Sequence, residues 1–210
     1  MAELLVRKLE HFEKLSEADK RVLQEATKDV REFAPHRDII SEGERPDYVH
    51  LLLEGWAYRY KIRPEGERSI MALLIPGDLC DVQVSLLNRM DHSIATLTAC
   101  RIALLSRDDI ADITKYDARL TRVLWWATLV DEAILREWVV NIGSRPATVR
   151  TAHLLCEMLL RLSAVGLASD DGYDLPLTQA ELADTMGISA VNRVIRRLRS
   201  EGSSAWKTDM

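Results

Sequence analysis

Residues 178–202 are the stretch that most constrains what this chain can fold into. Thr178 and Glu181 have the spacing of a capping box, in which each side chain accepts a hydrogen bond from an unpaired amide at the start of a helix. Gly187 can adopt the left-handed conformation that ends a helix, and Ser189 is a preferred residue at the start of the next one. Because Gly202 can end that second helix, the segment predicts a helix-turn-helix. Its buried face is expected to consist of Leu182, Ala183, Met186, Val191, Val194 or Ile195, and Leu198.

The second of these helices is rich in arginine. Residues 190–202 contain four arginines and one glutamate, a local charge of +3 in a chain whose net charge is -5. A helix that reads DNA needs donors for base edges near its start and cations for phosphates along its flank. An arginine-rich helix is often only a solvated face, but here a capped helix and a glycine turn precede it. We therefore predict DNA contacts from Thr178, Gln179, Ser189, Asn192, Arg193, Arg196 and Arg197.

The composition limits the class of protein. With 210 residues, of which 47% are hydrophobic, the chain can form two modest domains. The negative net charge excludes a surface that binds polyanions all over, so any nucleic-acid contact must be local. The N-terminal stretch carries charges throughout, and no segment reaches the roughly 18 apolar residues of a membrane span. Three widely spaced cysteines do not suggest a disulfide framework. We expect a soluble, cytoplasmic protein without membrane contact.

Short apolar runs and glycines alternate between residues 31 and 106. The runs YVHLLLEG, WAYRYKI, SIMALLIPG, SIATLTA and RIALLS have the length of strands. Turns are expected at Gly43, Gly55, Gly66 and Gly77. This spacing is typical of an antiparallel barrel, sandwich or roll. Helical spacing over residues 3–28 predicts helices that pack on this unit.

A long helix is predicted over residues 120–140, which contain no glycine or proline. Val123, Ala127, Val130 and Ile134 follow one another at alternating spacings of four and three, the seam of a coiled coil. The alternative is a helix packed on its own domain. The three tryptophans of this helix, however, offer more apolar surface than one β unit needs to cover it. We therefore predict that these four residues form a homodimer interface.

A break in the helix is predicted at residues 141–146 (NIGSRP). Gly143 suits a helix C-cap and Pro146 suits a helix start, and a further helix is expected over residues 147–165. The fold class is predicted as α+β, with an antiparallel β-roll, a long dimerisation helix and a C-terminal all-α helix-turn-helix domain. The predicted boundaries of these three parts are 1–117, 118–142 and 143–210.

The motifs resemble those of a known family. TQAELADTMGIS followed by VNRVIRRLRSEG resembles the DNA-binding element of the CRP/FNR family of bacterial transcription regulators. YVHLLLEGWAYRY and LLIPGDLCD resemble that family's cyclic-nucleotide-binding-type sensor, so the resemblance covers about residues 10–202. It implies an effector-responsive homodimer on a palindromic operator, with two recognition helices in successive major grooves about 34 Å apart. RNA polymerase and a small-molecule effector of unknown identity are the further partners that it implies.

The chain departs from the family's pattern around the recognition helix. Only Ala190 separates Ser189 from Val191, where relatives have three residues, so the helix is expected to start about 3 Å later and to lose its first base contacts. Arg193 matches a DNA-contacting arginine of the family. After Gly202 relatives continue into a β-hairpin wing, which SSAWKTDM is too short to form, so the winged-type domain is expected to lack its wing. We expect weaker DNA binding, and the alternative is a dimeric ligand-sensing protein with an impaired DNA-recognition element.

The sensor also differs from a cyclic-nucleotide pocket. In the family such a pocket presents a Gly-Glu pair to the ribose and an Arg-Ser or Arg-Thr pair to the phosphate. Aligned on the PGD of residues 76–78, these places fall near Asp81 and near His92 and Ser93. Because the phosphate-binding arginine is missing, an anionic ligand would lose its main electrostatic attraction, and cyclic AMP is not predicted as the effector. The effector pocket is expected to contain Asp78, Asp81, His92 and Ser93.

Neither a cofactor nor a metal is predicted. An iron–sulfur cluster would need cysteines near the N-terminus, yet none precedes Cys80. The five histidines are isolated from one another, unlike the paired histidines of metal-binding β-barrel enzymes. Haem ligation by one of them is a minor alternative. Because the chain also has no nucleophile elbow or phosphate loop, it is not predicted to be an enzyme.

Overall fold

The computed structural model describes residues 2–80, 82, 88–169, 172–188 and 191–200. Two short helices come first, α1 (Glu3–Leu9) and α2 (Glu17–Ala26). The strands that follow are β1 (Val30–Phe33), β2 (Asp38–Ile40), β3 (Tyr48–Glu54), β4 (Ala57–Ile62), β5 (Arg68–Leu74), β6 (Leu79–Cys80), β7 (Ser93–Thr96) and β8 (Cys100–Ser106). The helices after them are α3 (Arg107–Tyr116), α4 (Ala118–Ser144), α5 (Ala147–Val165), α6 (Gln179–Met186) and α7 (Val191–Ser200).

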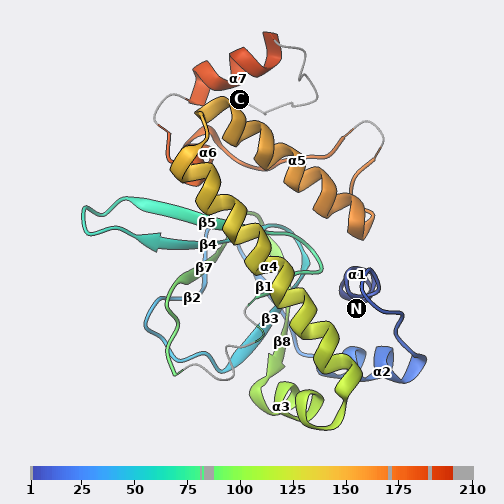
Figure 1. Ribbon diagram of the computed structural model, residues 1–210. Coiled ribbons are helices and arrows are strands. Elements are labelled where there is room, and N and C mark those ends of the chain that lie inside the picture. The colour runs from blue at the N-terminus through green and yellow to red at the C-terminus, as the bar shows by residue number, and fades with distance from the viewer. Residues whose placement is uncertain (1, 81, 83–87, 170–171, 189–190, 201–210) are drawn as a thin grey trace.

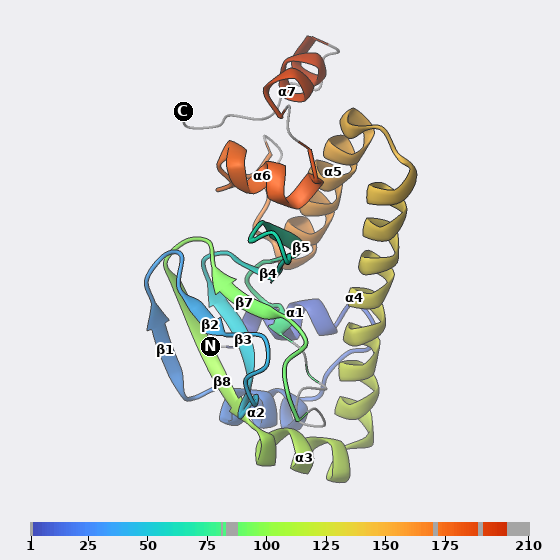
Figure 2. The ribbon, with the colours of Figure 1, turned by 90° about the vertical axis from the view of Figure 1, so that its left-hand side faces the viewer.

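The strands form two antiparallel sheets of four strands, in the orders β1-β8-β3-β6 and β2-β7-β4-β5. Leu51 and Ile102 from one sheet and Ile94 from the other belong to the same buried core. This β-roll confirms the predicted antiparallel unit and the α+β class (Figures 1 and 2). Gly55 shows why glycine marks a turn here. Its φ is 87°, and a Cβ at this position would lie 2.2 Å from the Ala99 carbonyl oxygen, so no side chain fits.

Helices close the open side of the roll. Leu5 of α1, Leu23 of α2, Ile110 of α3 and Leu124 of α4 are all buried in the core that the strands form. The prediction that residues 3–28 form helices packed on the β unit is thus confirmed. Ser16 begins α2 with a capping box, because its hydroxyl and the third residue of the helix satisfy each other's unpaired amides.

The predicted dimer seam lies largely within the protomer. Val123 is 0% and Ala127 is 6% exposed, and both belong to the core under the roll. Ile134 packs against a second core cluster, which includes Trp138, and Val130 is half-buried. The prediction of an interface is therefore wrong for Val123 and Ala127. Apolar spacing identifies a face of a helix but does not show which surface covers that face.

The long helix ends later than predicted. α4 continues through Gly143 to Ser144, and Arg145 is extended in front of Pro146. The predicted C-cap at Gly143 and the boundary at residue 142 are therefore wrong by a few residues. The reason is that proline disfavours the helical conformation in the residue before it, so the break falls at Arg145. None of the described helices is long and apolar enough to cross a membrane.

The C-terminal segment folds as a helix-turn-helix. Thr178 and Glu181 form the predicted capping box at the start of α6, and Gly187 ends α6 in the left-handed conformation at φ 61°. Val194, Ile195 and Leu198 form the buried face of α7. Residues 201–210, where the wing is expected to be missing, lie outside the described residues.

Candidate DNA interface and effector cavity

α7 presents arginines at the end of the molecule that is farthest from the β-roll (Figures 1 and 2). Arg193, Arg196 and Arg197 are exposed, while the opposite face of the helix packs on α5 and α6. This arrangement follows from the sequence pattern, because the apolar positions of α7 recur at helical spacing and leave the arginines outside. Ser189 and the side chain of Asn192, which were also predicted to contact DNA, lie outside the described residues.

The start of α6 is held by its own cap. Thr178 is exposed and Gln179 is half-buried. The Thr178 hydroxyl accepts a hydrogen bond from the Glu181 amide at 3.2 Å, and Glu181 accepts one from the Thr178 amide at 2.8 Å. Thr178 and Gln179, both predicted to contact DNA, therefore lie at or near the surface. The capping box fixes the backbone geometry at this start of α6.

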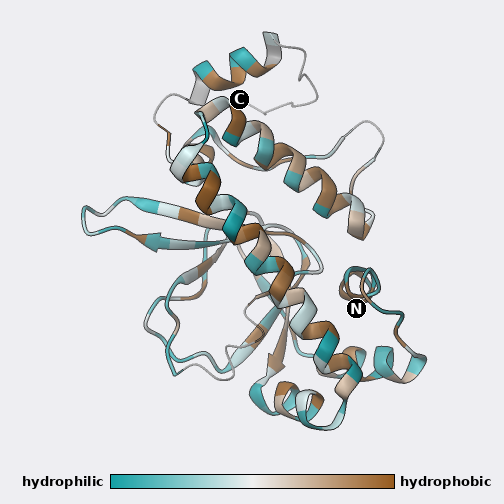
Figure 3. Ribbon diagram, viewed as in Figure 1, coloured by the Kyte–Doolittle hydropathy of each residue, from teal (hydrophilic) through white to brown (hydrophobic). Residues whose placement is uncertain are grey.

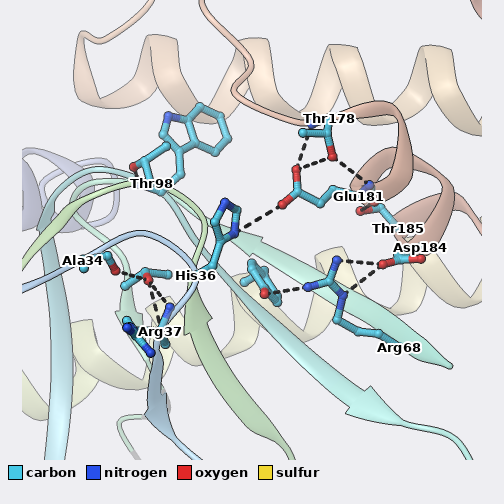
Figure 4. A network of polar contacts seen from close by, with 12 residues as sticks. Ala34, His36, Arg37, Arg68, Thr98, Thr178, Glu181, Asp184 and Thr185 are labelled. Carbon is cyan, nitrogen blue, oxygen red and sulfur yellow. Dashed lines mark hydrogen bonds and ion pairs between the residues drawn. The ribbon is translucent and has the colours of Figure 1, made fainter. Parts of the chain in front are cut away.

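α6 also docks on the β-roll, which sequence reasoning did not predict (Figure 4). Arg68 of β5 donates to Asp184 of α6 at 2.9 Å and to the Tyr58 hydroxyl at 2.8 Å. His36 Nδ1 lies 3.6 Å from Glu181 Oε1. The two domains are thus joined by charged and polar contacts that are partly open to solvent. No local signal could have found them, because Arg68 and Asp184 are 116 residues apart in the chain.

Asp78, predicted to face the effector, is instead a buried ion-pair residue. It is 2% exposed. Its carboxylate accepts hydrogen bonds from Lys8 Nζ at 2.8 Å, from Arg161 Nη2 at 2.6 Å and from the Ile75 amide at 2.8 Å. Burial by itself raises the pKa of Asp78, but the two cations outweigh it and lower the pKa to about 2. This prediction is therefore corrected: Asp78 already has partners on every side, so it joins elements of the fold.

A cavity of about 360 Å³ lies between the β-roll, α1, α4 and α5. His92, which the sequence placed in the effector pocket, lines this cavity, with Nδ1 2.8 Å from Asp91 Oδ1. Ser93 does not belong to its lining. Its hydroxyl instead accepts a hydrogen bond from the Glu42 amide, in the loop between β2 and β3, at 2.8 Å. Asp81 lies outside the described residues.

The charged lining of the cavity comes mostly from residues that were not predicted. Among the described residues, the lining includes the cations Lys8, Arg59, Lys61 and Arg161 and the acids Asp91, Asp131 and Glu132. They belong to α1, β4, α4, α5 and the loop before β7. Alternation along β4 could have suggested that Arg59 and Lys61 lie on the same side of the strand, since side chains two apart share a face. Nothing in the sequence pairs them with α1 or α5. Among the described residues, no group of histidine, cysteine or acidic side chains could hold a metal.

The outer side of α4 carries large apolar side chains. Hydrophobic residues occur along its whole length (Figure 3). The exposed ones, which we call the α4 outer face, are Trp125 (61%), Leu129 (58%), Leu135 (51%), Val139 (66%), Val140 (43%) and Ile142 (53%). At about 100° per residue, these positions fall within roughly 160° of the helix circumference, opposite the buried side. Glu132 and Arg136 are exposed on the same side of the helix and pair with each other. Large exposed apolar side chains gathered on one helix face mark a candidate protein–protein contact.

Comparison with known proteins gives two matches to family profiles. Residues 30–117 match the cyclic nucleotide-binding domain, and residues 149–207 match the Crp-like helix-turn-helix domain. The chain is 25% identical to the transcriptional activator protein FnrL of Cereibacter sphaeroides, over 85% of this chain and 73% of that protein. It is 27% identical to the transcriptional activatory protein AadR of Rhodopseudomonas palustris, over 93% and 81%. The solved structure of FixK2 from Bradyrhizobium japonicum has a similar fold, with a TM-score of 0.74 at 23% identity, covering 83% of this chain and 85% of that one.

The buried Asp78 carboxylate should make the stability of the protein depend on acid pH. Its folded-state pKa of about 2 is lower than the ordinary value of 3.8. Its charged form therefore stabilises the fold above about pH 4, and this contribution is lost as the pH falls towards about 2. We compare the free energy of unfolding of the parent chain with that of Asp78→Asn. The difference between the two should shrink by on the order of 2 kcal/mol between about pH 6 and pH 2. Urea unfolding across this range measures the difference, and a difference that stays constant would contradict the assignment.

Proposed function

Because this chain belongs to the CRP/FNR family of bacterial transcription regulators, we propose that it is an effector-responsive homodimer that binds palindromic DNA through α6 and α7. The observation that carries the proposal is the outer face of α7, where Arg193, Arg196 and Arg197 are exposed on a capped helix-turn-helix. Guanidinium groups on such a helix can donate to guanine edges in the major groove and to phosphates beside it.

The α4 outer face supports pairing with a second copy of the chain. Two α4 helices related by a two-fold axis would bury the same apolar residues on both sides, which is how an isologous interface is built. The same axis would relate the two α7 helices, and a palindromic site has the matching symmetry. This surface replaces the buried residues Val123 and Ala127 as the dimer interface.

The cavity supports an effector that is not a cyclic nucleotide. Its cations already lie beside carboxylates: Lys8 and Arg161 at Asp78, Arg59 at Asp131, and Lys61 at Glu42. A phosphodiester entering the cavity would therefore compete with these carboxylates for its counter-charge. Of the predicted pocket residues that the structure describes, His92 lines the cavity. Apolar side chains such as Leu74 and Leu79 form most of the described lining. A small molecule with an apolar body and polar groups that can interact with both charge signs fits this lining best.

The relatives named as activators support RNA polymerase as the further protein partner, with the bacterial cytoplasm as the place of action. No part of the proposal requires catalysis or a bound cofactor. A DNA-bound dimer would act by recruiting the polymerase, and the effector would change how well the dimer binds DNA.

DNA binding by α7 can be tested with two arginine variants. We expect Arg193→Ala to lower the affinity for a duplex selected by this protein from a randomised palindromic library by about tenfold, since a bidentate base contact contributes about 1–3 kcal/mol. Arg31→Ala on β1 serves as the matched control and should change nothing. Fluorescence anisotropy at two salt concentrations measures both, because phosphate contacts make binding weaken with salt. Failure of the parent chain to bind any duplex would favour the alternative of a sensor with an impaired DNA-recognition element.

The dimer can be tested by placing a charge on the α4 outer face. Val139→Asp would bury a carboxylate between two apolar helices, so we expect the protein to sediment as a monomer at micromolar concentration. Leu160→Asp is the matched control, because Leu160 is 71% exposed but lies on α5. Analytical ultracentrifugation of the parent and the two variants distinguishes the outcomes. A Val139→Asp variant that remains dimeric would refute this interface.

The selectivity of the cavity can be tested by calorimetry. We expect no heat of binding when cyclic AMP is titrated into the dimer at concentrations up to about 1 mM, because each cation lining the cavity is already paired. Micromolar affinity for cyclic AMP that is lost in Arg59→Gln would show that the cavity is a cyclic-nucleotide site after all.

A further inference from the structure

The carboxylate of Asp78 brings together three parts of the chain that are far apart in sequence. Lys8 comes from α1 and Arg161 from α5, and the side chains of all three residues are at most 16% exposed. Lys8 also lies 3.8 Å from Asp131 of α4. A buried charge is costly unless it is paired and hydrogen-bonded, so each of these groups depends on the others.

Arg161 is the residue of this cluster that belongs to the C-terminal domain. It donates to Asp78 at 2.6 Å, to the Leu73 carbonyl at 3.0 Å and to Glu157 at 2.9 Å. Glu157 in turn accepts the indole N–H of Trp138 at 2.7 Å. A continuous polar chain therefore runs from α4 through α5 to the turn before β6. The planar guanidinium allows this, since it presents several donors in a fixed geometry.

The position of α5 determines where the DNA-contacting helix lies. α7 packs on α5 and α6, so it moves with them. α7 lies at the end of the molecule away from the roll (Figure 2), and its described arginines are exposed. In a dimer the two α7 helices must be spaced about 34 Å apart to enter successive major grooves. The orientation of α5 against the β-roll and α4 thus determines whether both helices fit at once.

We propose that Arg161 is a positioning residue for DNA recognition: by bridging Asp78 and Glu157 it holds α5 on the sensor domain and so sets the spacing of the two α7 helices. This inference rests on the proposed function. Lys8 and Arg161 also line the cavity. A ligand at that end of the cavity touches the two side chains that hold α5, which gives the sensor a direct route to the DNA-binding domain.

The test compares Arg161→Lys with Arg63→Lys in the full-length protein. Lysine keeps the charge of Arg161 but cannot bridge two carboxylates in the same geometry. Arg63 pairs with Glu67 on the exposed β4–β5 turn, so its variant controls for the loss of a guanidinium. Asp78→Asn is the second variant, which removes the negative charge that Arg161 pairs with. Circular dichroism establishes that each variant is folded.

Two measurements decide the outcome. Hydrogen exchange should accelerate in residues 147–165 of Arg161→Lys and Asp78→Asn but not of Arg63→Lys. Affinity for the selected palindromic duplex should fall by about tenfold in these two variants, while affinity for a duplex with one half-site stays unchanged. A merely structural role would weaken both duplexes alike, and that result, or no loss at all, would overturn the proposal. If the parent chain binds neither duplex, the proposed function itself fails, and hydrogen exchange still shows whether Arg161 holds α5.

Discussion

The carboxylate of Asp78 is the contact on which the arrangement of the parts depends. It lies at the turn before β6 and is met by Lys8 from the first helix and by Arg161 from the C-terminal domain. Two cations and one anion are nearly removed from water there, and this is tolerable only because every charge has a partner. The N-terminal helix, the turn before β6 and α5 therefore meet at this carboxylate, while α6 contacts β5 separately through Arg68 and Asp184.

α4 has apolar side chains on two sides, one buried against the roll and one exposed. Val123 and Leu124 close the core of the roll, while Leu129 and Val139 remain exposed on the other side. A helix with large apolar side chains on two opposite sides needs two partners to cover them. One partner is the protomer's own sensor domain, and the proposed second is another copy of the chain. The cavity lies against this same helix, at Thr128 and neighbouring residues, so a ligand bound there would be close to the proposed dimer interface.

Local features could be predicted from the sequence, and contacts between distant segments could not. The capping box of Thr178 and Glu181 was predicted because it involves residues three apart, and the β-roll because its turns recur at regular intervals. Asp78 was expected in the effector pocket because it stands beside the aligned ligand positions. In the structure its carboxylate is buried beneath Lys8 and Arg161, which themselves line the cavity.

The succession of β-roll, long helix and helix-turn-helix, the caps of α6 and the family could all be predicted from the sequence, since each depends on residues that are close together in the chain. Only the tertiary structure decided which face of α4 is buried, which cations line the cavity, and how α6 docks on β5 through Arg68 and Asp184. The physical reason is that burial and charge pairing depend on what lies opposite a side chain. That partner can come from any part of the chain, and spacing along the sequence does not identify it.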